Sequence, residues 1–179
     1  DNIVDEIPSN GEYYISIDYG TMNPFSAGLW CVLGDKATRI KEYYYNGREK
    51  AVQRTDEDYC DSVEELAKGY NIRQIVVDPS AASFITALRR RGFTIRKANN
   101  DVLDGIRRTA VYLKNGNIKI HRSCVDAIAE FGLYRWDDKS TEDTVIKEND
   151  HAMDDIRYFC NTIMKNKVRK ESNYTPIFM

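Results

Sequence analysis

The chain has 179 residues, of which 42% are hydrophobic and 30% are charged, and this composition is typical of one globular domain that can bury its own core. No apolar run approaches the roughly 20 residues that cross a bilayer, and we find no secretory leader, so we expect no membrane partner. The four cysteines form neither a CxxC pair nor a zinc-ligand spacing, which favours buried free thiols.

The charge of the chain is unevenly distributed. A net charge of −2 argues, taken alone, against a protein that binds nucleic acid. However, the stretch from Arg89 to Arg122 holds ten Lys or Arg against two Asp, a local balance of +8, whereas residues 1–69 hold fourteen acids against seven bases. We therefore expect one strongly basic face and a separate group of carboxylates.

The first third of the chain predicts consecutive strands. Residues 1–12 are expected to be a linker from a preceding domain, and a strand follows at 13–17. Two further β-rich runs, at 25–33 and 38–45, are separated by a turn. These three runs predict three antiparallel strands.

The middle of the chain alternates between helix and strand. Thr55 is a good N-cap for a helix that Gly69 ends, and a nearly continuous apolar strand follows at 72–77. A helix at 80–91 and a strand at 93–97 come next. The order predicts an α/β fold with a mixed sheet, in which the parallel strands bring their carboxyl ends to one edge.

The last third adds helices and one short strand. We expect a helix at 102–114, a strand at 117–121, a helix at 123–136, a polar loop at 137–149, and a final helix from Asp150 that buries Ala152, Ile156, Phe159 and Ile163. The folded domain is therefore expected to cover 13–164, followed by a basic tail at 165–179.

Three acidic residues are placed where an enzyme could use them. Asp18 ends the first strand, Asp78 ends the strand at 72–77, and Asp154 lies near the start of the final helix. Two divalent ions roughly 4 Å apart can activate water and stabilise the leaving oxygen in phosphodiester hydrolysis, and hard ions such as Mg²⁺ or Mn²⁺ prefer carboxylate oxygens. If these acids converge, Asp18 would bridge both ions.

Each of these acids also has an ordinary structural interpretation. Asp18 could form a turn, Asp78 could cap the helix that follows it, and Asp154 could be a solvated acid at a helix N-terminus. Asp155 lies closer to the buried edge of the final helix and is the second choice for a metal ligand, whereas Asp150 is the expected N-cap.

Several motifs make a resemblance specific. The segment NDHAMDDIRY at 149–158 is similar to a pattern of the nuclease domains of tailed-phage large terminase subunits. IDYG and VVDPSAASF match in the same order, and NNDVLDGIRR and SCVDAIAEFGLYRWDD also look like this family. The resemblance spans residues 13–164.

The resemblance implies a ribonuclease H-like fold related to Holliday-junction resolvases, and a metal-dependent endonuclease that cuts concatemeric double-stranded phage DNA during packaging. It implies that Asp18, Asp78 and Asp154 hold two Mg²⁺ or Mn²⁺ ions, and that His151, three residues before Asp154, helps to position water or metal. It also implies an ATPase domain in the same polypeptide, a portal protein and a small terminase subunit as partners, and a place in the host cytoplasm, transiently at the procapsid portal.

The basic stretch suggests a DNA track, in which Arg107, Arg108 and Lys114 contact phosphates. Three alternatives stay open. Two share the fold: another ribonuclease H-like nuclease such as a junction resolvase, and a non-catalytic DNA-binding module. The third is an actin-like sugar kinase, because the segment IDYGT resembles the first phosphate loop of that family. The kinase would need a second Gly-rich phosphate loop, which we do not find. The sequence also lacks GxxxxGK[ST], so this segment carries no ATP motor of that type.

Overall fold

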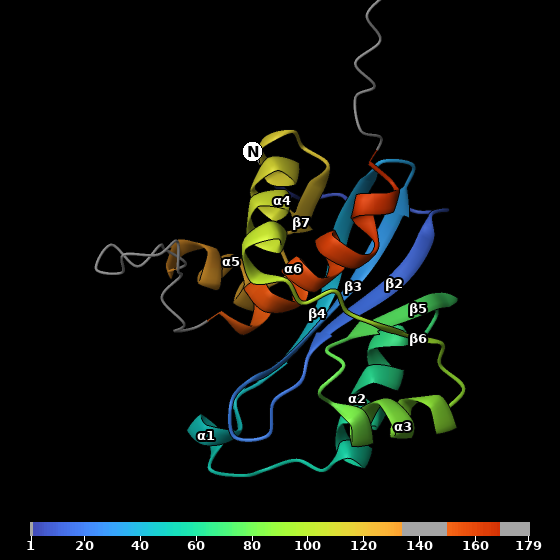
Figure 1. The fold of residues 1–179 in the computed structure, drawn as a ribbon, viewed down its shortest axis with the longest axis vertical. Helices are drawn as coiled ribbons and strands as arrows, with labels where there is room; N and C mark the ends of the chain where they lie inside the picture. Colours follow the sequence, from blue (N-terminus) through green and yellow to red (C-terminus); the bar gives the residue numbers. More distant parts are fainter. Residues whose placement is uncertain (1, 134–149, 169–179) are drawn as a thin grey trace, which may run out of the picture.

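The computed structural model describes residues 2–133 and 150–168 (Figure 1). They form a seven-stranded mixed sheet in the order β1-β7-β4-β3-β2-β5-β6. The strands are β1 (Ile3–Val4), β2 (Glu12–Asp18), β3 (Phe25–Leu33), β4 (Lys36–Tyr45), β5 (Ile72–Val77), β6 (Ile95–Lys97) and β7 (Ile118–His121). The helices are α1 (Gly47–Lys50), α2 (Asp56–Ala67), α3 (Ala82–Arg90), α4 (Val102–Lys114), α5 (Val125–Leu133) and α6 (His151–Thr162), followed by a 3₁₀ turn at Met164–Asn166.

The predicted fold class is confirmed. Strands β2, β3 and β4 pair antiparallel, whereas β5 joins β2 in parallel and β6 joins β5 in parallel. Strand β2 therefore lies between the antiparallel and the parallel parts of the sheet, and Asp18 stands at its carboxyl end. The four cysteines are buried free thiols, as expected, and none of the described helices is long and apolar enough to cross a membrane.

Some boundaries differ from the prediction. The predicted linker at 1–12 contains β1, whose two residues pair in parallel with β7. Two residues are too few to show a periodicity, so the sequence gives no signal for this strand. The sixth strand begins at Ile95 and is shorter than predicted. The predicted loop at 137–149 and most of the tail lie outside the described residues.

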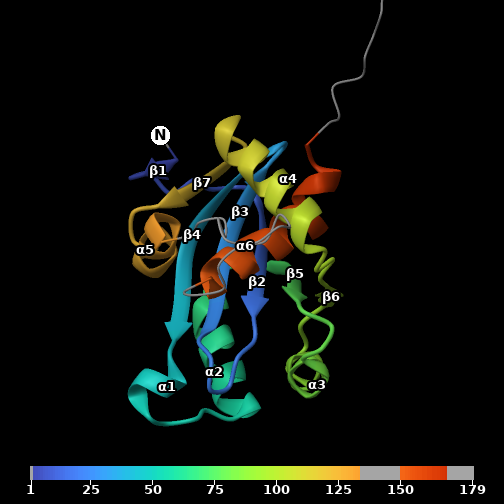
Figure 2. The ribbon, with the colours of Figure 1, turned by 60° about the vertical axis from the view of Figure 1, so that its left-hand side comes forward.

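Helices cover both faces of the sheet (Figures 1 and 2). Helices α4, α5 and α6 lie on one face, and α2 and α3 lie on the other. Side chains alternate along the strands, so Tyr14 and Trp30 face the α6 side while Ile15 and Leu29 face the α2 side. Helix α6 packs across β2, β3 and β5. This packing brings the start of α6 to the sheet edge where β2 ends.

Candidate active site

A pocket of about 300 Å³ opens where β2 ends and α6 begins. Its lining residues are Asp18, Tyr19, Asn23, Asp150, His151 and Asp154. Asp18 comes from the last position of β2, and His151 and Asp154 come from the first turn of α6, three residues apart and so on one helical face. We call this the Asp18 pocket.

Asp18 and His151 form a hydrogen-bonded pair in this pocket. Nδ1 of His151 lies 2.9 Å from Oδ2 of Asp18, and the two side chains are 20% and 14% exposed. Burial raises the pKa of Asp18 to about 7, although the hydrogen bond from His151 acts in the opposite direction. Burial alone would lower the pKa of His151, but the hydrogen bond to Asp18 and the charge of Asp18 raise it.

Asp154 is paired with an arginine of its own helix. Its Oδ1 accepts hydrogen bonds from Nη2 of Arg157 at 3.0 Å and from Nε at 3.3 Å. Burial raises the pKa of Asp154, and Arg157 opposes this shift. Nη1 of Arg157 also donates to the backbone carbonyls of Asn100 and Asp101, so one guanidinium links Asp154 to the segment that begins α4.

Asp78 follows β5 and does not line the Asp18 pocket. Its Oδ1 accepts the backbone N–H of Ser80 at 2.8 Å, and its Oδ2 accepts from Nδ2 of Asn100 at 3.2 Å. Burial pushes its pKa up, but hydrogen bonds from Ser80, Asn100 and Tyr158 hold the pKa below its usual value. Burial raises the pKa of Tyr158, and the negative charges of Asp18, Asp154 and Asp78 raise it further.

The donor chemistry of these residues fits a hard divalent cation, but the donors are not assembled around one point. In residues 2–133 and 150–168, no three His, Cys, Asp or Glu side chains are close enough to hold an ion. The Asp18 pocket nevertheless holds two partly buried carboxylates, Asp18 and Asp154, and burial raises the pKa of each despite the opposing effects of His151 and Arg157. A cation bound by their oxygens would favour the charged form of both.

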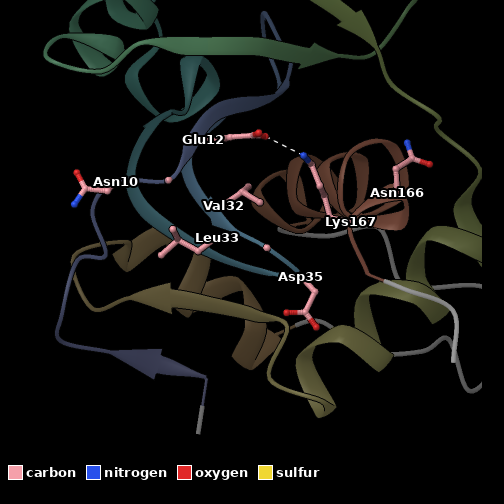
Figure 3. Close-up of a pocket in the computed structure, with 9 residues that line it drawn as sticks. Asn10, Glu12, Val32, Leu33, Asp35, Asn166 and Lys167 are labelled. Carbon is pink, nitrogen blue, oxygen red and sulfur yellow. Dashed lines mark hydrogen bonds and ion pairs between the residues drawn. The ribbon is translucent and has the colours of Figure 1, made fainter.

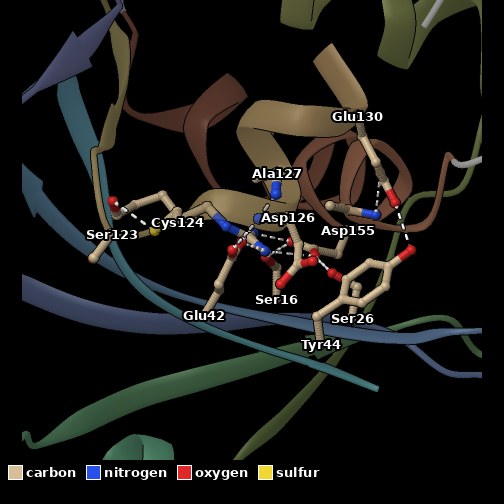
Figure 4. Close-up of polar contacts among 12 residues, drawn as sticks. Ser16, Ser26, Glu42, Tyr44, Ser123, Cys124, Asp126, Ala127, Glu130 and Asp155 are labelled. Carbon is tan, nitrogen blue, oxygen red and sulfur yellow. Dashed lines mark hydrogen bonds and ion pairs between the residues drawn. The ribbon is translucent and has the colours of Figure 1, made fainter. Parts of the chain in front are cut away.

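Asp155, the second choice for a metal ligand, faces the sheet and is fully buried (Figure 4). Nη1 of Arg39 lies 2.5 Å from Oδ1 of Asp155, and both side chains are 0% exposed. The hydroxyls of Ser16 and Ser26 donate to the two oxygens of Asp155 at 2.7 and 2.5 Å. All of its acceptor positions are engaged, so Asp155 holds α6 against the sheet and does not reach the pocket.

Asp150 stands at the N-cap position of α6, as expected, but its side chain makes no capping hydrogen bond. It is 8% exposed and lines the Asp18 pocket instead. A third carboxylate therefore faces the pocket beside Asp18 and Asp154.

The comparisons with known proteins show the family of the chain and agree with its fold. Residues 15–162 match the family model described as the terminase RNaseH-like domain. The chain belongs to this family. It is 26% identical over 164 residues to the terminase large subunit of Escherichia phage T5, a match that covers 87% of this chain and 36% of the relative.

Solved structures of large terminases have the same fold. The structure of the large terminase of the thermophilic bacteriophage D6E, in complex with ADP, matches with a TM-score of 0.87 and 40% identity, over 91% of this chain and 42% of that chain. The g2p large terminase nuclease domain of bacteriophage SPP1, with bound Mn, matches with a TM-score of 0.63 and 18% identity, over 87% of this chain and 92% of that chain. The terminase domain described here thus spans less than half of the T5 and D6E proteins.

The predicted DNA contacts of this terminase domain lie on α4 and differ in their surroundings. Arg107 and Lys114 are exposed. Arg108 is half-buried, and its guanidinium donates to Oδ1 of Asn161 at 3.0 Å and to Oδ2 of Asp104 at 3.4 Å. Arg108 therefore helps to fasten α4 to α6. Contacts of Arg107, Arg108 and Lys114 with phosphates stay a prediction.

Sequence reasoning missed several residues that hold these acids in place. Arg39 and Arg157 contact Asp155 and Asp154, and Asn100 contacts Asp78. For Arg157 a signal was available, because it lies three residues after Asp154 on one helix. Arg39 is 116 positions from Asp155, and no local pattern connects them.

Proposed function

We propose that this domain is a divalent-metal-dependent endonuclease that cuts double-stranded DNA. The observation that carries the proposal is the pair of partly buried carboxylates, Asp18 and Asp154, that line one pocket at the carboxyl edge of the sheet and have raised pKa values. The Mn bound to the SPP1 nuclease domain supports a divalent cation in a protein of this fold.

We propose a separate role for each residue of the site. We propose that Asp18, Asp78 and Asp154 would hold two Mg²⁺ or Mn²⁺ ions. Asp18 would be shared, because it lines one pocket with Asp154 and its strand β2 pairs directly with β5, which precedes Asp78. When bound, such ions make a water molecule nucleophilic and stabilise the leaving oxygen of a phosphodiester. His151 would orient the Asp18 carboxylate through its hydrogen bond. Because His151 also lines the pocket, it could accept or donate a proton there.

The wider role follows from the large terminases that the chain resembles. We propose that the domain cuts concatemeric phage DNA during packaging, as part of a polypeptide that also carries an ATPase domain. Its partners would be a portal protein and a small terminase subunit, and it would work in the host cytoplasm at the procapsid portal. The T5 and D6E proteins, which are more than twice as long as the matched segment, leave room for such a second domain.

Calorimetric titration with Mn²⁺ tests the metal site directly. We expect the domain to bind Mn²⁺ and Asp18→Asn to abolish binding. Asp35→Asn is the matched control, because Asp35 is an exposed acid at the opposite end of the sheet. Equal binding by wild type and Asp18→Asn would place the metal elsewhere and contradict the assignment.

A plasmid assay tests the reaction. We expect cleavage with Mn²⁺ or Mg²⁺, none with EDTA, no dependence on ATP, little preference for sequence, and steep inhibition by salt because phosphate contacts supply the affinity. Cleavage that survives EDTA, or that occurs at one short sequence only, would overturn the proposed mechanism.

A further inference from the structure

Glu130 of α5 contacts the first turn of α6, the turn that carries His151 and Asp154. Its Oε2 accepts the backbone N–H of Ala152 at 2.7 Å and that of Met153 at 3.1 Å. The hydroxyl of Tyr44, on β4, donates to Oε1 of Glu130 at 2.8 Å (Figure 4). Glu130 is only 4% exposed, so these hydrogen bonds form away from solvent.

These two N–H groups belong to the first turn of α6, where a helix has no backbone carbonyl of its own to accept them. With Asp150 at the N-cap, Ala152 and Met153 occupy the second and third helical positions, whose N–H groups an N-cap side chain usually accepts. The side chain of Asp150 makes no such hydrogen bond. Glu130 therefore replaces the missing N-cap from a different helix.

The same arrangement occurs once more in the adjoining elements. Glu42 of β4 accepts the backbone N–H of Asp126 at 2.7 Å and that of Ala127 at 3.3 Å, in the first turn of α5. The central sheet thus fixes the start of α5 through Glu42, and α5 fixes the start of α6 through Glu130. An acceptor supplied from another element fixes where a helix begins relative to that element, which a local N-cap cannot do.

We propose that Glu130, oriented by Tyr44, is a positioning residue for the active site. It fixes the first turn of α6 relative to the sheet and thereby sets where His151 and Asp154 stand with respect to Asp18. The proposal rests on the proposed metal site in the Asp18 pocket. Glu130 does not line that pocket, so its effect on metal binding acts through α6.

Variants of Glu130 and Tyr44 separate positioning from plain stability. Glu130→Leu removes the acceptor at similar volume, Glu130→Gln keeps an amide oxygen that can accept both N–H groups, and Tyr44→Phe removes only the orienting hydroxyl. Glu65→Leu is the control, because Glu65 is an exposed glutamate on α2. Each is measured well below its unfolding temperature, by calorimetric titration with Mn²⁺ and by hydrogen exchange of the Ala152 and Met153 amides.

We expect Glu130→Leu to weaken Mn²⁺ binding on the order of 10-fold, in the range found for partners that orient metal ligands, and to speed exchange of both amides. Tyr44→Phe should act in the same direction but less, and Glu130→Gln and Glu65→Leu should stay close to wild type. If Glu130→Leu does not fold, Tyr44→Phe decides the question, with Glu130→Gln as the control that keeps the acceptor.

If Glu130 only stabilises the fold, its loss should lower the melting temperature without changing the Mn²⁺ affinity. Unchanged Mn²⁺ affinity in Glu130→Leu, or in Tyr44→Phe if the first variant is unfolded, would overturn the proposal even if the melting temperature falls. If the wild-type protein binds no Mn²⁺, the proposed function fails instead, and the exchange rates of the two amides still show whether Glu130 holds the start of α6.

Discussion

The two faces of the sheet are built from different chemistry. The face covered by α4, α5 and α6 contains the buried charged residues of the described chain, among them Arg39, Glu130, Asp155 and Arg157. The face covered by α2 and α3 is apolar and aromatic, and no charged side chain of the described residues is buried there. Each face nevertheless has a hydrophobic cluster of its own, so the two faces differ in their buried charges and not in whether they have a core.

The face covered by α2 and α3 is held together by hydrophobic and aromatic contacts. The ring of Phe25 stacks on Tyr59 with centroids 4.1 Å apart, and Phe84 meets the Phe25 ring edge-on at 5.6 Å. Aromatic stacking also occurs on the α6 face, where Trp30 stacks on Phe159, so it does not by itself distinguish the two faces. What the α2 and α3 face lacks, within the described chain, is buried charge. Hydrogen-bonded charges are directional, and they occur on the face where α6 must present Asp154 to Asp18. The comparison predicts that damage to the two faces has different consequences.

The largest effect is expected at Asp18. Asp18→Asn should reduce plasmid cleavage by more than the roughly 10- to 100-fold that loss of an outer partner costs, because it removes a proposed metal ligand itself. The domain should stay folded, because burial already disfavours the charged form of Asp18, as its raised pKa shows. Cleavage rates and circular dichroism check both claims. Near-normal cleavage by the folded variant would remove Asp18 from the mechanism.

Asp155→Ala should damage both stability and metal binding. It removes the closer of the two carboxylates that contact the buried guanidinium of Arg39 and leaves only Glu42, at 3.4 Å. Breaking a buried ion pair from one side typically costs about 3–5 kcal/mol. Because α6 also loses its anchor to the sheet, Mn²⁺ affinity of the remaining folded protein should fall. Urea unfolding and calorimetry measure the two effects. The double change Arg39→Met with Asp155→Leu should cost less stability than Asp155→Ala, and an equal cost would mean that the ion pair is not the cause.

Leu88→Ala, on the opposite face, should damage stability alone. Leu88 is fully buried in α3, and loss of such a side chain typically costs about 2–5 kcal/mol. The loss resembles that of Asp155→Ala, but we expect unchanged Mn²⁺ affinity below the unfolding transition, because Leu88 packs in the cluster under α2 and α3 and does not line the Asp18 pocket. A fall in affinity as large as that of Asp155→Ala would break the distinction between the two faces.

Gly28→Ala tests how tightly side chains pack on the face covered by α4, α5 and α6. A Cβ at Gly28 would overlap the guanidinium of Arg39, which lies across the β3 backbone there. Forcing extra volume into such a site typically costs about 1–3 kcal/mol. Urea unfolding of Gly28→Ala should show this loss, whereas Gly132→Ala, where a Cβ meets no neighbouring atom, should show none. Equal stability of the two variants would mean that Arg39 can move freely.

The smallest effect is expected at the far end of the sheet. Glu12 is hydrogen-bonded to Lys167 at 2.9 Å, beside a surface pocket that Asp35 also lines (Figure 3). The hydrogen bond from Lys167 lowers the pKa of Glu12. The stabilisation is therefore present above the usual pKa of a glutamate and is lost as the pH falls through the lowered value.

Because both side chains are about one third exposed, Glu12→Gln should cost less than about 1 kcal/mol at neutral pH. It should also make the free energy of unfolding less dependent on pH in the acid range, and it should leave cleavage unchanged. Altered cleavage would show that the two ends of the sheet are coupled.

Much of the fold could be predicted because its signals are local. Thr55 begins α2 as an N-cap, and the structure adds a reciprocal hydrogen bond with Asp58. Helical phase placed Asp154 off the buried stripe of α6 and Asp155 nearer to it, and the structure shows Asp155 fully buried. The two-residue strand β1 was missed because nothing in so short a segment distinguishes strand from linker.

The contacts that hold the candidate site are mostly non-local, which is why the sequence does not predict them. Arg39 donates a hydrogen bond to Asp155, and the N–H of Ala152 donates one to Glu130. In both cases folding brings together two segments that no sequence motif connects. Asp78 shows the limit of a local interpretation: its Oδ1 accepts the N–H of Ser80 in the turn before α3, but the N-cap of α3 is Ala81 and no side chain caps this helix. The interpretation of Asp78 as a helix cap is therefore wrong. Whether Asp78 joins the metal stays a prediction.

Helix α6 has almost no free face. Ten of its twelve residues are buried, and the two that are not, His151 and Asp154, open into the Asp18 pocket. A surface helix usually has a side on which substitutions are neutral, but this helix has none. Mutations in it should therefore be eliminated by selection more often than mutations in α2 or α3. Among diverging relatives this segment should change most slowly, and it is the part of the chain by which a distant member could still be recognised.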